Sequence, residues 1–216
     1  MRNAFIAPLI AMATLASARP AMSADPSVVE ESGTFEVGQL LPELTCTTDT
    51  GRLWRSADYV RCKLLVIYFS TGDFSDGSIE QAKGFREGLK RLEELNVDVL
   101  GVSGDTVGIN ALFKKSHGLK YTLLADPEGN VAEKLGVPVK RSALPTKVRA
   151  RDLDCKPIMD DHDKSIIVKR NVTHSHWTFI VDLDGKIISK RCDVNPASDA
   201  DDVRKVIERL SSSVAP

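Results

Sequence analysis

Short apolar stretches alternate with amphipathic ones along much of the chain. Residues 63–69, Lys-Leu-Leu-Val-Ile-Tyr-Phe, form a continuous run rich in β-branched and aromatic residues, which is typical of a strand buried on both faces. Over residues 76–95 apolar side chains recur at helical spacing with Glu, Lys and Arg between them, which predicts a helix after this central strand. The alternation continues with a second strand over Val97–Val102 and a second helix over Asp105–His117, for which Asp105 is the expected N-cap.

The remaining elements follow the same logic at both ends of the chain. Apolar pieces on either side of a glycine turn predict two hairpins, one near the amino terminus and one late in the chain. The expected elements are apolar pieces at Phe35–Val37, Leu44–Thr47 and Leu53–Trp54, a third strand at Tyr121–Ala125, a short helix at Asn130–Leu135, a late hairpin of Trp177–Val181 with Lys186–Ser189, and a final helix after Ser198. This order predicts an α/β fold: a mixed central sheet with helices on both faces and an N-terminal β-hairpin.

The regular pattern ends between Val137 and Asn171. This stretch, an insertion at about residues 138–172, carries a basic cluster from Lys140 to Arg151, then Cys155, then the acidic run Asp160-Asp-His-Asp163. We expect a structureless connection, which is either a functional loop or a tolerated insertion because it exceeds the usual loop length. The basic cluster is either a solvated loop face or a docking surface for an acidic partner.

The first residues have the features of a targeting segment. Arg2 is followed by an apolar stretch to Ala18 and by small residues before Asp25, so residues 1–24 are expected to be a signal peptide cleaved near Ala24. The alternative, an uncleaved membrane anchor, is disfavoured because the apolar run is shorter than a bilayer requires. We therefore expect a secreted or periplasmic protein, with a linker at 25–33 and one domain at 34–213.

Composition narrows the possible partners. The chain has 216 residues, with 29 Lys and Arg against 30 Asp and Glu, so its formal charge of −1 gives no electrostatic reason to expect binding to nucleic acid or to an anionic membrane. No later stretch predicts a membrane span. The four cysteines form no CxxC pair, and in an exported protein they could make two disulfides. They are Cys46, Cys62, Cys155 and Cys192.

Four segments of the chain stand out together: residues 66–87, the opening 37–42, the Leu-Leu-Ala-Asp-Pro-Glu-Gly turn at 123–129 and the late hairpin 178–185. These segments resemble the peroxiredoxins, the alkyl hydroperoxide reductase and thiol-specific antioxidant superfamily, especially its bacterioferritin-comigratory branch. The resemblance implies a thioredoxin-like fold over residues 34–212 and thiol-dependent reduction of hydroperoxides, an antioxidant role. It also implies re-reduction by thioredoxin or a similar dithiol, and we expect no cofactor.

The chemistry departs from that family at the active-site motif. The family motif Phe-Thr-Pro-X-Cys aligns without a gap, which places the threonine position on Ser75, the proline on Asp76 and the peroxidatic cysteine on Ser78. A serine hydroxyl is a far weaker nucleophile than a thiolate and cannot form a sulfenic acid. In addition, Asp76 would raise the pKa of a thiol beside it.

Two further family positions are also changed. The family has an arginine before the late hairpin, and His176 occupies that position in this chain. The position of the family's resolving cysteine is occupied by Lys83. The resemblance therefore suggests a catalytically degenerate member with a binding or scaffold role toward a protein partner. The alternative is an active thiol peroxidase that uses another cysteine.

The cysteines and histidines leave several possibilities open. None of the cysteines is expected at a helix amino terminus, so structural pairs such as Cys46–Cys62 and Cys155–Cys192 stand beside a relocated redox pair or free thiols. His174 and His176 are expected to point to one face of a strand. Together with His162 and its neighbouring aspartates they are weak candidates for a zinc or copper site, whereas a solvated or hydrogen-bonded histidine pair is the alternative.

Overall fold

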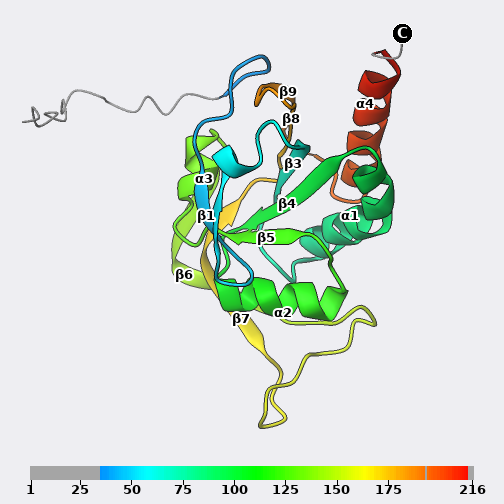
Figure 1. Cartoon of the computed structure of the whole chain (residues 1–216). Helices are drawn as coiled ribbons and strands as arrows, with labels where there is room; N and C mark the ends of the chain where they lie inside the picture. Colours follow the sequence, from blue (N-terminus) through cyan, green and yellow to red (C-terminus); the bar gives the residue numbers. More distant parts are fainter. Residues whose placement is uncertain (1–34, 193, 214–216) are drawn as a thin grey trace, which may run out of the picture. The chain divides into compact units, whose positions relative to one another are not determined.

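The computed structural model describes residues 35–192 and 194–213 (Figure 1). The expected signal peptide, 1–24, and the linker, 25–33, lie outside these residues. Within the described part, no helix has the length and apolar character needed to cross a membrane. The elements in chain order are β1 (Thr45–Thr48), β2 (Leu53–Arg55), a 3-10 turn η1 (Ser56–Asp58), β3 (Leu64–Phe69), α1 (Asp76–Glu94), β4 (Val97–Ser103), α2 (Val107–His117), β5 (Thr122–Ala125), α3 (Asn130–Lys134), β6 (Val139–Arg149), β7 (Ile167–His174), β8 (Thr178–Val181), β9 (Ile187–Arg191) and α4 (Asp199–Ser213).

Seven strands form one mixed sheet in the order β2-β1-β5-β4-β3-β8-β9. The central strands β3, β4 and β5 are parallel, whereas β1 and β2 pair antiparallel as the expected N-terminal hairpin and β8 pairs with β9 as the late one. The apolar piece Phe35–Val37 is not a strand. The chain just after it runs along β9 instead, with the Gly38 amide donating to the Ile187 carbonyl over 2.8 Å.

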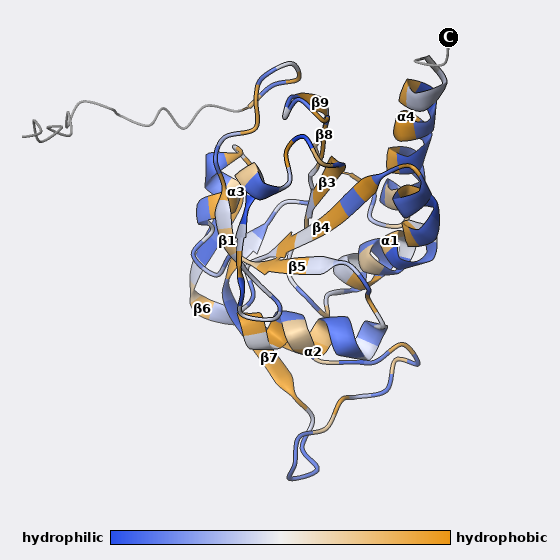
Figure 2. Ribbon diagram, in the orientation of Figure 1, coloured by the Kyte–Doolittle hydropathy of each residue, from blue (hydrophilic) through white to orange (hydrophobic). Residues whose placement is uncertain are grey.

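Helices cover both faces of this sheet, as the sequence predicts. The alternation of side chains along β3 divides the core in two, because successive residues of a strand point to opposite faces. Val66 and Tyr68 face α1, α2 and α4, whereas Ile67 and Phe69 belong to the cluster that includes α3. Figure 2 shows hydrophobic residues along β3 and β4 and hydrophilic ones on much of α1 and α4.

The insertion is ordered, contrary to the expectation of a structureless connection. Strands β6 and β7 form a separate antiparallel ribbon with a register shift between Arg141 and Thr146. Its inward face mixes apolar and polar side chains, which hides the period-two pattern in the sequence. The buried inward residues of β7 are Val168, Arg170, Val172 and His174.

A buried ion pair ties this ribbon to the loop before α1. Nε of Arg170 donates to a carboxylate oxygen of Asp105 over 2.9 Å, and both side chains are at most 2% exposed. The same guanidinium donates to the Asp73 carbonyl, while the Asp73 amide donates to the other oxygen of Asp105 over 2.7 Å. Asp105 is therefore an ion-pair partner and not the expected cap of α2, whose N-cap is Thr106.

Gly72 is required by this arrangement. Its φ is +136°, and a Cβ at this position would overlap the guanidinium of Arg170. Only glycine combines this backbone conformation with such a close approach of the guanidinium. Residues 72–74, which lead into α1, are thus fixed by a side chain from a strand far along the chain.

Replacing Arg170 with leucine should destabilise the fold strongly. The substitution leaves the Asp105 charge buried without its cation, which typically costs about 3–5 kcal/mol. Urea unfolding followed by circular dichroism measures the free energy of unfolding. The control is Arg209→Leu on the exposed side of α4, which should change that free energy by less than about 0.5 kcal/mol. Equal effects of the two substitutions would contradict a structural role for the ion pair.

Candidate functional site

The amino terminus of α1 carries the aligned motif. Ser75 is the N-cap, with extended backbone angles of −73° and 153°, and its hydroxyl accepts a hydrogen bond from the Ser78 amide. This is the usual capping geometry of a serine at that position. The hydroxyl oxygen of Ser75 also lies 2.7 Å from that of Ser78 and 3.0 Å from that of Thr71. Three hydroxyls therefore form a connected chain at the start of the helix.

Ser78 lies at the inner end of this chain and is buried, with 1% exposure. The interior space that it lines together with Tyr68 and Asp73 has no room for a water molecule. Burial and the nearby charge of Asp105 raise the pKa of the Asp73 carboxyl, and one of its oxygens has no hydrogen-bond partner. Ser78 is thus closed off from solvent, and it lies beside the carboxyl of Asp73, whose charged form is disfavoured.

Asp76 does not point at Ser78. Its side chain is 90% exposed and forms an ion pair with Arg151, which belongs to the segment between β6 and β7. A carboxylate in the first turn also interacts favourably with the helix dipole. The expectation that Asp76 would act directly on position 78 is therefore weakened, because its charge is turned to solvent and paired.

His176 lies at the same helix terminus, as the alignment predicts. Its Nε2 is 3.2 Å from the place where a Cβ on Gly77 would be, so a glycine makes room for the ring. Its Nδ1 is 2.9 Å from Oε1 of Gln81, and Nε2 of Gln81 donates to Asp199 over 2.9 Å. Because the Gln81 amide group is committed to the carboxylate, its oxygen must accept a hydrogen from Nδ1 of His176.

This chain of hydrogen bonds fixes the state of the histidine. Burial lowers the pKa of His176, so the ring is neutral near pH 7 and Nε2 carries a lone pair in place of a proton. Asp199 is held in turn by Thr178 over 2.6 Å and by Arg191 over 3.1 Å. At the position that would hold a permanent cation, the protein therefore presents a neutral acceptor.

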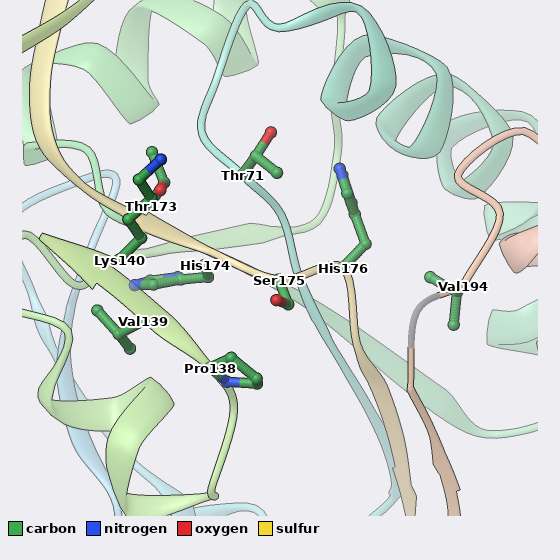
Figure 3. Close-up of a pocket in the computed structure, with 9 residues that line it drawn as sticks. All are labelled: Thr71, Pro138, Val139, Lys140, Thr173, His174, Ser175, His176 and Val194. Carbon is green, nitrogen blue, oxygen red and sulfur yellow. The ribbon is translucent and has the colours of Figure 1, made fainter.

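His174 and His176 line one pocket but do not point the same way (Figure 3). The pocket has a volume of about 480 Å³, and its other lining residues are Thr71, Pro138, Val139, Lys140, Thr173, Ser175 and Val194. The His174 side chain is fully buried, with Nε2 3.5 Å from an oxygen of Asp126, and burial lowers its pKa. The expectation of two rings on one face is wrong because β7 ends at His174, before His176.

No metal site assembles from the weak candidates. His162 is exposed in the segment between β6 and β7, whereas His174 is buried against Asp126 and His176 is bonded to Gln81. Among the residues that the structure describes, no group of three or more His, Cys, Asp or Glu side chains could hold a metal ion.

The expected disulfides are not formed in this structure, in which Cys46, Cys62 and Cys155 are free thiols. Cys46 is buried in β1 with its sulfur 3.1 Å from the Ala125 carbonyl, and burial raises its pKa to about 12. Cys62 and Cys155 are exposed, as is Cys192 after β9. None of the four lies at the amino terminus of a helix, where a thiolate is favoured.

Sequence reasoning missed three residues of this region. Gln81 and Asp199 orient His176, and Arg170 holds the loop before α1. A signal was present for Gln81, which is a polar residue one turn after Ser78 on the buried face of the helix. Arg170 lies between Val168 and Val172 in an alternating stretch, but nothing in that pattern indicates that a charge faces inward.

Comparisons with known proteins identify the family. The model of the AhpC/TSA family matches residues 37–190. A putative peroxiredoxin bcp of Coxiella burnetii is 36% identical over 115 residues, which cover 53% of this chain and 76% of that protein. Peroxiredoxin Bcp of Bacillus subtilis is 35% identical over 104 residues, which cover 48% of this chain and 66% of that protein.

Solved structures agree in fold. Peroxidoxin BcpB of Mycobacterium tuberculosis superposes with a TM-score of 0.62 at 20% identity, over 82% of this chain and 98% of that one. A cysteine-to-serine mutant of PrxQ from Xylella fastidiosa gives 0.63 at 19% identity, over 85% and 99%. The expected thioredoxin-like fold is confirmed. With the family model spanning most of the chain, the protein belongs to the AhpC/TSA family, among peroxiredoxins of the bacterioferritin-comigratory branch.

Proposed function

We propose that this peroxiredoxin has lost hydroperoxide reduction at the family site and uses its fold as a binding scaffold. Peroxiredoxins reduce hydroperoxides through a cysteine thiol and are generally re-reduced by thioredoxin-like partners. The observation that carries the proposal is Ser78, which aligns with the peroxidatic cysteine and is closed in at the inner end of a hydroxyl chain. A hydroxyl there cannot be oxidised to a sulfenic acid and returned by a thiol.

The charges around Ser78 indicate that the site differs from a peroxidatic site by more than the replacement of a cysteine sulfur by a serine oxygen. An activated thiolate needs a nearby cation or several hydrogen bonds to its charged form. His176 is a neutral acceptor, and Arg170, the buried cation that β7 brings to the loop before α1, is committed to Asp105 and to the Asp73 carbonyl. The helix amino terminus therefore remains the main feature at this position that would favour a thiolate.

The alternative function is a thiol peroxidase that uses a relocated cysteine. Its support is that Cys62 and Cys155 are exposed free thiols, which peroxide and a reductant could reach. Cys155 also lies in the segment whose Arg151 contacts the start of α1. Such an enzyme would require a thioredoxin-like reductant, as the family does.

Peroxide consumption separates the two functions. The mature chain, residues 25–216, with excess dithiol should consume hydrogen peroxide no faster than a control without protein. The thiol of the Ser78→Cys variant should react with hydrogen peroxide at a rate within about tenfold of that of an ordinary buried thiol. No cation is available at this position to lower the pKa of the thiol. The assay follows peroxide loss with time.

Either of two outcomes would overturn part of this proposal. If the natural chain turns over peroxide and Cys155→Ser or Cys62→Ser abolishes it, the relocated-cysteine enzyme is correct. If Ser78→Cys alone restores enzymatic turnover, only the thiol was missing, and the proposal that the surroundings of residue 78 no longer activate a thiol is refuted.

The cysteines themselves should differ greatly in reactivity. With a pKa of about 12, Cys46 is almost entirely a thiol at pH 8 and is shielded by β1 and β5. Its alkylation by iodoacetamide should be about 1000-fold slower than that of Cys62 or Cys155, since the thiolate is the reacting species. Peptide mass spectrometry with time gives the rates, and rapid labelling of Cys46 would reopen it as a candidate nucleophile.

We also propose that the chain is exported, on the basis of Arg2, the apolar stretch that follows and the small residues up to Ala24. Expression of the full chain in a bacterial host should yield periplasmic protein that begins at Asp25, as measured by intact mass. A control that lacks residues 2–18 should stay in the cytoplasm. Retention of the full-length mass in the membrane fraction would instead support an uncleaved anchor.

A further inference from the structure

The outward face of the β6–β7 ribbon is basic. Paired residues of antiparallel strands lie on the same side of a ribbon, and the pairs Lys147 with Lys169 and Arg149 with Ile167 alternate with the inward pair Val148 and Val168. Lys140, paired with Thr173, is on the outward side as well. We call the four outward cations the basic face: Lys140, Lys147, Arg149 and Lys169.

The basic face has no counter-charge in the part of the chain that the structure describes. Arg141 and Arg151 form ion pairs with Glu133 and Asp76, but no acidic side chain in residues 35–192 or 194–213 pairs with a member of the basic face. Lys147 stands directly opposite Lys169, an arrangement of like charges that is destabilising. An external anionic group would therefore be stabilised here and would relieve this repulsion.

The surface is hollowed where these charges gather. A groove of about 660 Å³ is lined by Lys147, Val148, Arg149, Arg151 and Ile167. Ile167 is 42% exposed, and Leu144, in the irregular part of β6, is 81% exposed. A partner for this face must thus offer both negative charge and apolar side chains.

The segment that joins the two strands has the complementary character. Residues 152–164, which we call the tip, contain five aspartates against two lysines. The tip also exposes Leu153 and Met159, at 51% and 48%. Figure 1 shows this segment extending past α2 and away from the sheet, and Figure 2 shows that its end is hydrophilic. The tip folds into two tight turns, closed by hydrogen bonds from the Asp152 amide to the Lys156 carbonyl and from the Asp160 amide to the Lys164 carbonyl. The four members of the basic face remain exposed.

We propose that the basic face binds the tip of a second copy of this chain, and that two arms exchange these contacts in a symmetric dimer. Each arm, residues 139–174, contains both a basic face and a tip. In a dimer with a twofold axis, the tip of each protomer binds the basic face of the other, which gives two equivalent contacts. Nucleic acid is a poorer occupant because the rest of the chain is acidic overall and the groove contains no aromatic side chain for base stacking.

The size of the arm is adequate for such an interface. Stable protein interfaces use roughly 20–30 residues on each side with an apolar centre and a polar rim. The arm provides exposed apolar residues on both parts, Leu144 and Ile167 near the basic face and Leu153 and Met159 in the tip. The charged residues would fix how the two arms align, and these apolar side chains would supply the apolar surface that is buried in the interface.

Charge reversal on each half tests the proposal with the mature chain. The face variant is Lys147→Glu, Arg149→Glu, Lys169→Glu, and the tip variant is Asp154→Lys, Asp161→Lys. Light scattering after size exclusion at about 0.05 M salt should show a dimer for the natural chain. Its dissociation constant should rise at least about tenfold at about 0.5 M salt, where charge interactions are screened.

Each variant alone should be monomeric, because its face and its tip then carry charges of the same sign. An equimolar mixture of the two should form a heterodimer, since the acidic arm of one fits the basic arm of the other. The matched control is Lys83→Glu, Lys90→Glu, Lys134→Glu, three exposed lysines on α1 and α3, which should dimerise like the natural chain. A natural chain that is monomeric at low salt, or variants that dimerise alone, would overturn the proposal.

Discussion

The arrangement of this protein depends on one buried charge pair, Arg170 with Asp105. The guanidinium comes from the β6–β7 ribbon and holds the loop before α1 through the Asp73 carbonyl, passing close to Gly72, where a Cβ would overlap it. A buried ion pair is costly to separate because either charge left alone in the interior is poorly solvated. The insertion is therefore part of the site's framework, and α1 begins where the ribbon places it.

At that helix terminus the family fold is present, and Ser78 stands at the position that aligns with the peroxidatic cysteine. The helix still presents unpaired amides and the positive end of its dipole, which in this family favour a thiolate. Here Ser75 accepts a hydrogen bond from one of these amides, that of Ser78, and the neighbouring histidine is kept neutral by burial while its Nδ1 is hydrogen-bonded to Gln81. The Ser78 hydroxyl is thus buried and hydrogen-bonded to Ser75 at this terminus.

The same ribbon that stabilises the site has an outward side with a different role. Its inward residues satisfy Asp105 and fill the space beside Ala150, whereas its outward residues gather cations that no acidic side chain in the described residues balances. A protein surface commonly disperses charges of one sign. Their concentration on one ribbon, with an acidic tip at its end, gives the arm the character of an interaction element.

The central sheet, the helices on both faces, the two hairpins and the position of Ser75, Ser78 and His176 at one helix terminus were all predictable from the sequence. The elements follow from local periodicity, and Ser75 and Ser78 follow from a motif whose residues are close along the chain. His176 is assigned to this terminus through the family resemblance, by its place just before the late hairpin. Three features became known only from the folded chain: the ordered insertion, the inward direction of Arg170 and the free thiols of Cys46, Cys62 and Cys155. Each of these depends on contacts between segments distant along the chain. The free energy of burying a charged side chain such as Arg170 depends on the group that pairs with it in the folded protein. Local sequence patterns do not reveal which group that is.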